Sequence, residues 1–226
     1  SPLLSNIMLN ELDKELERRG LPFVRYADDS MIFCKSKRAA MRVKESITRF
    51  IENTLYLKVN KEKTVVSYVR GVKYLGYSFY VMKGKCQLTV HPKSKAKMKS
   101  RLKELTSRSN GWGYAKRKQK LKEYIRGWVG YYHLANMKRL LLDTDEWLRR
   151  RIRMCIWKAW KKVKTKVANL IKCGINKYQA YEWGNTRKGY WRIADSPVLK
   201  RAIDNNKLRS AGYATLMEAY LEWYPK

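Results

Sequence analysis

The sequence is poor in acidic side chains. It has 19 Asp and Glu against 51 Lys and Arg in 226 residues, which gives a formal net charge of +32. A surface this basic favours a polyanionic partner, with nucleic acid as the first candidate and an acidic membrane surface as the alternative. Long apolar runs are also lacking, because none approaches the roughly 20 residues of a membrane-spanning helix. The opening residues do not have the pattern of a signal peptide, so neither a membrane segment nor secretion is expected.

Cysteine and histidine are too scattered for a zinc site of the usual spacing. The chain has four cysteines without a Cys-x-x-Cys pair, namely Cys34, Cys86, Cys155 and Cys173, and two isolated histidines, His91 and His133. We therefore expect reduced thiols in a cytoplasmic protein, and no structural zinc.

The basic charge is divided unevenly along the chain. Residues 1–92 hold 17 Lys and Arg against 9 Asp and Glu, whereas residues 93–226 hold 34 against 10, so the net charges are +8 and +24. The pair His91-Pro92 interrupts the pattern at this point. Because 45% of the residues are hydrophobic, each part can bury a core. The sequence therefore predicts two domains, residues 1–92 and residues 93–226.

The first part alternates between helical and strand periodicity. An apolar residue recurs every fourth position from Leu4 to Leu16, and Gly20 ends this helix. The stretches "LPFVRY" and "SMIFC" read as two strands joined by a tight "ADD" turn. Residues 38–54 have the spacing of a second amphipathic helix.

Four further stretches have strand character: "YLKVN", "TVVSYV", "VKYLGYSFYVM" and "CQLTV". The first two flank the polar "KEK", and the last two are joined by "KGK". The order of helix, hairpin, helix and strands predicts an α+β fold with an antiparallel sheet.

Asp28 and Asp29 stand side by side in the tight turn between two apolar strands. Two such carboxylates repel each other unless a cation neutralises them. Mg²⁺ prefers hard oxygen ligands, and two such ions about 4 Å apart can activate a primer hydroxyl and stabilise a leaving pyrophosphate. An ordinary Asp-rich turn is the simpler explanation if the pair is taken alone.

The motifs around the pair favour the metal site. "YADD" resembles the active-site hairpin of reverse transcriptases, and "SPLLSNIMLNELDKEL" resembles the motif upstream of it, which contacts the template and the incoming nucleotide. "LKVNKEKT" resembles the downstream motif, and "YLGY" resembles the primer-grip turn. In the second part, "IRGWVGYY" and "RRRIRMCIWKAWKK" resemble the maturase region, or thumb. The chain as a whole most resembles group II intron-encoded reverse transcriptases, also called maturases.

The resemblance implies roles for individual residues. Asp28 and Asp29 would be the catalytic carboxylates that bind Mg²⁺. The residues expected to contact the primer or the nucleotide are Tyr26, Ala27, Lys63, Tyr74, Leu75, Gly76 and Tyr77. For Lys63 a solvated turn lysine is the alternative, and for the "YLGY" residues a turn packed on the core is compatible with the primer-grip role.

The second part is expected to be all helical. Its apolar stripes include Met98 to Leu105, Leu121 to Tyr132 and Leu148 to Ala159. Opposite the third stripe, a helical wheel places four cations and an indole on one face: Arg150, Arg153, Trp157, Lys161 and Lys164. Such a face suits RNA, because cations meet phosphates and an indole can stack. The alternative is that the indole covers a neighbouring helix and the cations are only solvated.

These observations predict a partial polymerase palm followed by a helical thumb or maturase domain. The resemblance implies an RNA-directed DNA polymerase, a nucleotidyltransferase of a mobile element, that also assists RNA splicing. Its partners would be group II intron RNA, an RNA template, a DNA primer and deoxynucleoside triphosphates, in a bacterium or an organelle, with a bacterium favoured. The alternatives are a splicing maturase without polymerase activity, and another bacterial reverse transcriptase such as a retron type.

The resemblance also places the chain within a longer pattern. In the family, the fingers, the first half of the palm and a third catalytic aspartate precede the motif found at Ser1. The expectation is therefore that this chain alone binds structured RNA but does not polymerise.

Overall fold

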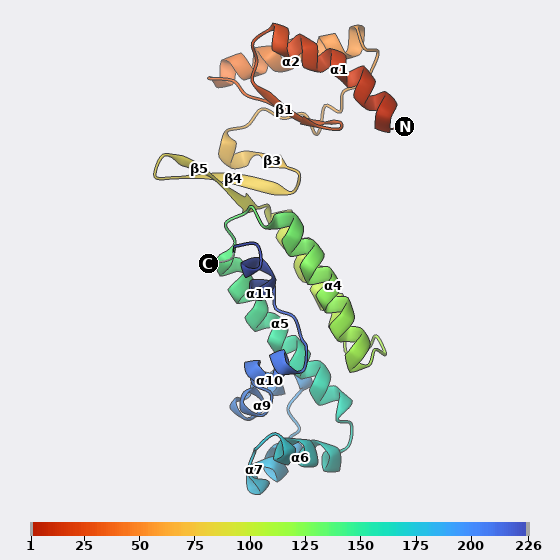
Figure 1. Ribbon diagram of the computed structural model, residues 1–226, viewed down its shortest axis with the longest axis vertical. Coiled ribbons are helices and arrows are strands. Elements are labelled where there is room, and N and C mark those ends of the chain that lie inside the picture. The colour runs from red at the N-terminus through yellow and green to blue at the C-terminus, as the bar shows by residue number, and fades with distance from the viewer. Residues whose placement is uncertain (1, 225–226) are drawn as a thin grey trace. The chain divides into compact units, whose positions relative to one another are not determined.

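The computed structural model describes residues 2–224 (Figure 1). The chain divides into two compact units, the first ending at His91 and the second beginning at Pro92. The first unit combines helices with two small antiparallel sheets, and the second is helical throughout the part that the structure describes. The predicted α+β class is therefore confirmed.

The first half of the first unit is a strand hairpin with two helices. Its elements are α1 (Pro2–Arg18), β1 (Phe23–Tyr26), β2 (Asp29–Ile32) and α2 (Lys37–Asn53). At the end of α1, Gly20 has a φ of +64°, and the Leu21 amide donates to the Leu16 carbonyl at 3.0 Å. This is a glycine-dependent helix stop, as the sequence predicts. The core between the helices is formed by Leu12, Leu16, Ile47 and Leu55.

The second half of the first unit is a three-stranded antiparallel sheet. After a short 3-10 helix (Val69–Gly71), its strands are β3 (Lys73–Tyr74), β4 (Tyr77–Met82) and β5 (Lys85–Val90). Both turns are two-residue loops with positive φ at both positions: Leu75-Gly76 at +49° and +81°, and Lys83-Gly84 at +50° and +73°. That geometry is the type I′ turn, whose twist matches that of the strands, and glycine tolerates it without a steric penalty.

The prediction of strands at "YLKVN" and "TVVSYV" is wrong. Within the described chain, residues 54–68 contain no strand, and no neighbouring strand supplies hydrogen bonds to them. A turn organises this segment instead: the Lys63 amide donates to the Asn60 side chain at 3.1 Å, and the Lys44 ammonium donates to the Thr64 carbonyl at 2.6 Å. The alternating apolar pattern alone is not sufficient, because a strand forms only where a partner edge is present.

The second unit is built on two long helices. Its elements are α3 (Pro92–Leu105), α4 (Tyr114–Tyr132), α5 (Lys138–Ala159), α6 (Val163–Lys172), α7 (Lys177–Gly184), α8 (Tyr190–Ile193), α9 (Pro197–Ala202), α10 (Asn205–Ser210) and α11 (Leu216–Leu221). Helix α11 packs on both α4 and α5, α3 also contacts both, and α8 packs on α5 (Figure 1).

The predicted apolar stripes form the core of this unit. Residues that are at most 5% exposed include Met98, Leu102, Leu105, Leu121, Ile125, Leu148, Ile152 and Cys155. The helical periodicity of the sequence therefore identifies the buried faces of α3 and α4 and one buried face of α5. Among residues 2–224, no helix is long and apolar enough to cross a membrane.

Asp145 fixes the start of α11 from a position in α5. Its two carboxylate oxygens accept the Leu216 amide at 2.8 Å and the Met217 amide at 2.9 Å. Asp145 is 2% exposed, and burial raises the pKa of its carboxyl while the two amide hydrogen bonds oppose that shift. A helix of six residues has little stability of its own, so its docking depends on this contact.

We predict that Asp145→Ala lowers the free energy of unfolding of the second unit by about 2 kcal/mol, because two buried amides lose their acceptor. All eight tryptophans lie in residues 93–226, so tryptophan fluorescence during urea unfolding follows this unit alone. The matched control is Asp143→Ala, an exposed aspartate in the same helix, which should change the value by less than about 0.5 kcal/mol. Equal effects of the two substitutions would contradict the assignment.

Candidate functional site

Asp28 and Asp29 lie at the tip of the β1–β2 hairpin. Tyr26 pairs with Asp29, so the loop consists of Ala27 and Asp28 alone. Ala27 has a φ of +54°, the left-handed value found at the first loop position of type II′ turns, where glycine is usual. Both carboxylates are exposed. An alanine held in this conformation means that the surrounding structure imposes the turn geometry at some local cost.

Arg25 holds the hairpin tip against α1. Its guanidinium donates to both Asp13 carboxylate oxygens, at 2.8 Å from Nε and 2.5 Å from Nη2. Its Nη1 donates to the Asn6 side-chain oxygen and to the Ala27 carbonyl, each at 3.0 Å. The hydrogen bond to Asp13 raises the pKa of Arg25, and burial opposes the shift. One side chain therefore connects α1 to the carbonyl immediately before Asp28.

Arg25 was not among the site residues predicted from the sequence. A signal was present, because an arginine inside the apolar "FVRY" strand needs a partner, and Asp13 lies on the preceding helix. Proximity of the two could not be derived without the angle at which α1 meets the hairpin.

An open pocket of about 650 Å³ lies against this hairpin. It is lined by Asn6, Asp13, Phe23, Arg25, Tyr26 and Ala27. Tyr26 is 66% exposed, so its ring is free to meet a ligand. The two aspartates adjoin this pocket in sequence but do not line it.

Tyr74, in β3, is electrostatically coupled to the same hairpin. Burial raises the pKa of Tyr74, the charge of Asp29 adds to the shift, and Arg25 opposes it. Of the "YLGY" residues 74–77, Tyr74 is therefore within reach of the field of Asp29. Lys63 is different: it is exposed, and within residues 2–224 no hydrogen bond or ion pair joins its side chain to the hairpin.

The residues present suit part of a magnesium site. Within residues 2–224 no three His, Cys, Asp or Glu side chains gather as a metal-binding group, so Asp28 and Asp29 would hold a metal ion without a third such ligand. Mg²⁺ is commonly bound through one or two carboxylates, with waters and substrate phosphates completing its shell. Two exposed carboxylates on a rigid turn are compatible with that arrangement.

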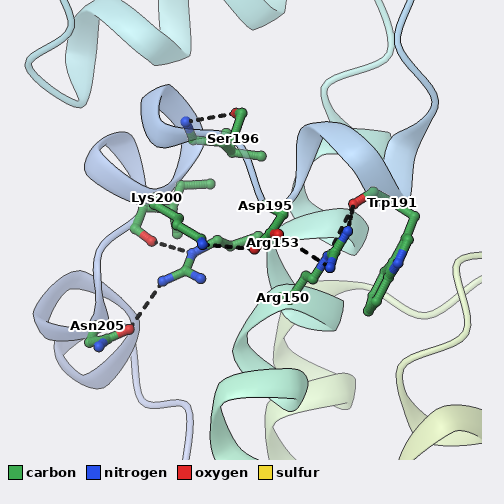
Figure 2. Close-up of polar contacts among 9 residues, drawn as sticks. Arg150, Arg153, Trp191, Asp195, Ser196, Lys200 and Asn205 are labelled. Atoms are coloured by element: carbon green, nitrogen blue, oxygen red, sulfur yellow. Dashed lines mark hydrogen bonds and ion pairs between the residues drawn. The ribbon is translucent and has the colours of Figure 1, made fainter.

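The predicted basic face of α5 is not exposed as expected. Figure 2 shows Arg150 against the ring of Trp191, with 3.9 Å between the guanidinium carbon and the ring centroid. Arg150 also donates to the Trp191 carbonyl at 3.0 Å and pairs with Asp195 at 3.3 Å, while Asp195 pairs with Lys200 at 2.8 Å. The guanidinium is therefore engaged within the protein.

Arg153 and Trp157 correct the prediction more strongly, because both are buried, at 6% and 2% exposed. Arg153 donates to the Ile203 carbonyl at 2.7 Å and to the Asn205 side chain at 3.0 Å (Figure 2). Burial lowers the pKa of Arg153. The prediction fails because the segment that contains α8, α9 and α10 covers the polar side of α5, so this helix is packed on both sides.

Lys161 and Lys164 lie outside α5, which ends at Ala159. Lys161 follows the helix, and Lys164 belongs to α6. Both are exposed. The helical wheel continued past the true end of the helix because neither glycine nor proline marks that end.

We predict that Arg25→Ala loosens the β1–β2 hairpin, because the partly buried hydrogen bonds of a charged guanidinium are lost. Amide hydrogen exchange in residues 23–32, followed by mass spectrometry, should become roughly tenfold faster or more. The control is Arg18→Ala at the end of α1, the helix that Arg25 contacts; the Arg18 side chain is 71% exposed in its pair with Glu15, so its loss should leave that exchange unchanged. Unchanged exchange in Arg25→Ala would show that the hairpin holds its shape without this contact.

Each of the two units contains a region that matches a known protein family. Residues 1–79 match the model described as Reverse transcriptase (RNA-dependent DNA polymerase), and residues 95–174 match the model described as Group II intron, maturase-specific domain. No curated protein matches the chain significantly. The two matched domains imply binding of intron RNA and nucleic-acid substrates. Their occurrence in this order, with the aspartate hairpin in the first and the helical core in the second, means that the chain belongs to the group II intron reverse transcriptase/maturase family.

Proposed function

We propose that this chain supplies the metal-binding hairpin and an RNA-binding surface of an RNA-directed DNA polymerase that acts on group II intron RNA. The observation that carries the proposal is the exposed pair Asp28, in the two-residue loop, and Asp29, at the start of β2, within the region matched to reverse transcriptases. A loop this short keeps the two carboxylates close together, and Arg25 restrains the carbonyl beside them.

In this proposal Asp28 and Asp29 hold Mg²⁺ at the primer end. A bound Mg²⁺ activates the primer hydroxyl and neutralises charge on the phosphates of the incoming deoxynucleoside triphosphate. The carboxylates orient that ion, and the exposed ring of Tyr26, next to Ala27, packs against the primer end or the nucleotide.

The "YLGY" turn is proposed to position the primer. The type I′ geometry of the turn holds its backbone in one orientation toward a primer. The charge of Asp29 influences the pKa of Tyr74, which ties this turn to the aspartate pair. A rigid support of this kind matters because a misplacement of about 1 Å in the primer hydroxyl can cost a hundredfold in rate. RNA template, DNA primer and deoxynucleoside triphosphates are the proposed substrates.

We predict that Asp28→Asn, made in an active polymerase that contains this chain, reduces Mg²⁺-dependent primer extension roughly a thousandfold or more. The amide removes the ligand charge but keeps the size of the side chain, so the hairpin should fold. RNA affinity should change less than twofold, because the carboxylate acts on the transition state rather than on duplex binding. Glu45→Gln, an exposed acid on α2, is the control that should leave both properties unchanged. Extension at the unsubstituted rate would remove the catalytic role and leave an RNA-binding maturase.

RNA binding is proposed to use the exposed lysines of the second unit, where the net charge is +24. Each phosphate contact contributes roughly 0.7 to 0.9 to the slope of log affinity against log salt. We predict that the double substitution Lys161→Gln with Lys164→Gln lowers the magnitude of that slope by the contribution of one to two phosphate contacts, measured by filter binding with intron RNA. Arg150→Gln is the matched control, because its guanidinium is engaged by Trp191 and Asp195 and should leave the slope unchanged. A lower slope in Arg150→Gln together with an unchanged slope in the lysine double variant would mean that RNA binds to α5 instead.

A further inference from the structure

Helices α6 and α7 pack on each other as a helical hairpin (Figure 1). At their contact, a Cβ added to Gly184 would lie 2.6 Å from a Val167 methyl group, so only glycine allows this approach. The inner face also buries Leu170, Ile175 and Ala180. With the inner faces joined, the outer face of α7 is left to solvent.

The outer face of α7 carries two tyrosines. Tyr178 is 83% exposed and lies opposite the buried Ala180 and Gly184, whereas Tyr181, which is 53% exposed, lies beside that buried face. Residues three apart on a helix are neighbours on its surface, so the two tyrosines occupy adjacent positions of α7. The start of the helix is fixed by the Asn176 side chain, which accepts from the Gln179 amide at 2.8 Å.

The free faces of these rings distinguish them from other exposed aromatics in the second unit. Arg150 covers Trp191, Arg108 lies over Tyr190 at 5.0 Å, and His133 stacks on Trp223 at 4.1 Å. In the described chain, no cation, ring or hydrogen bond engages the side chain of Tyr178 or that of Tyr181; the Asn185 amide bonds only to the Tyr181 backbone carbonyl. Each uncovered ring can therefore stack against another planar group, such as a base.

The charge around the rings favours a polyanion. Residues 161–188 contain eight Lys and Arg against one acid, Glu182. Besides the exposed Lys161 and Lys164, this segment has Lys188, whose ammonium lies 4.8 Å from the Trp183 ring centroid on α7. An acidic membrane would need aliphatic residues on this face, and α7 presents tyrosines beside Lys177 and Glu182 instead.

We infer that the outer face of α7 binds unpaired bases of RNA, with the bases stacked on Tyr178 and Tyr181 and the phosphates held by the lysines of the α6–α7 hairpin. Base–aromatic stacking is available only to bases outside a duplex, because paired bases already stack on one another. The inference rests on the RNA binding proposed above and adds a site and a preference for single strands. Both tyrosines lie beyond residues 95–174, which match the maturase-specific model.

Glu182 supplies an internal check on this site. It lies four residues from Tyr178, so its carboxylate shares the outer face with the rings and repels phosphates. Removing its charge with Glu182→Gln should therefore strengthen RNA binding at this face, by about twofold at low salt and less at high salt.

The test is fluorescence anisotropy on the purified chain with two fluorescein-labelled RNAs of equal charge, a single-stranded oligoadenylate and a fully paired hairpin. Tyr178→Ala with Tyr181→Ala should weaken oligoadenylate binding at least about tenfold and hairpin binding less than twofold. Tyr178→Phe with Tyr181→Phe retains both rings and should bind within twofold of the unsubstituted chain. The alanine pair should also leave the salt slope unchanged, unlike the glutamine substitutions at Lys161 and Lys164.

Each other outcome overturns the inference. Unchanged oligoadenylate binding in the alanine pair would show that the rings do not stack, and equal losses on both RNAs would assign them a role without preference for unpaired bases. A loss in the phenylalanine pair as large as in the alanine pair would mean that the hydroxyls, not the rings, make the contact. If the unsubstituted chain bound neither RNA, the proposed RNA binding would fail together with this site, whereas the other outcomes leave the former intact.

Discussion

The second unit depends on basic side chains that satisfy the carbonyl ends of its short helices. Every helix leaves acceptors without intrahelical partners at its end, where the helix dipole also favours a cation. In five helices a basic side chain donates to a carbonyl at or just beyond the last turn. The pairs are Arg151 with α3, Lys207 with α6, Arg150 with α8, Arg153 with α9 and Lys118 with α10. Three of the five come from α5, so this helix is the element on which the others are assembled. Part of the large positive charge is therefore structural and is not directed at RNA.

The first unit uses the same chemistry on a smaller scale. Arg25 reaches the Ala27 carbonyl in the hairpin turn, and Lys44 reaches the Thr64 carbonyl in a segment without regular structure. In both cases a cation holds backbone that has no ladder or helix to satisfy it. The aspartate pair thus stands on a turn stabilised from outside the hairpin, which is how a two-residue loop with alanine at positive φ can be maintained.

The sequence was sufficient where a local pattern has one structural solution. Helix periodicity predicted α1 to α5, and the polar "ADD" between apolar runs predicted the hairpin and its aspartates. The apolar stripe of α1 is half right, because Leu12 and Leu16 are buried while Leu4 and Met8 are 63% and 42% exposed. It was not sufficient where tertiary partners decide. Arg153 and Trp157 read as an exposed face because a wheel cannot show that a segment 50 residues later covers it. The stretches at 56–60 and 64–69 were predicted as strands, because alternation of apolar and polar residues cannot show whether a partner edge is available. The roles of the aspartates and of the basic residues in catalysis and RNA binding remain predictions.

Because Arg153 is buried, its structural hydrogen bond should depend less on salt concentration than the attraction of exposed lysines for RNA. At about 1 M salt the screening length is near 3 Å, so exposed lysines such as Lys161 lose most of their attraction for phosphate. The guanidinium of Arg153, enclosed and in direct contact with the Ile203 carbonyl, is reached by few ions and keeps its hydrogen bond. Concentrated salt should therefore strip nucleic acid from this protein while leaving it folded, which makes a salt wash a gentle way to recover it free of RNA.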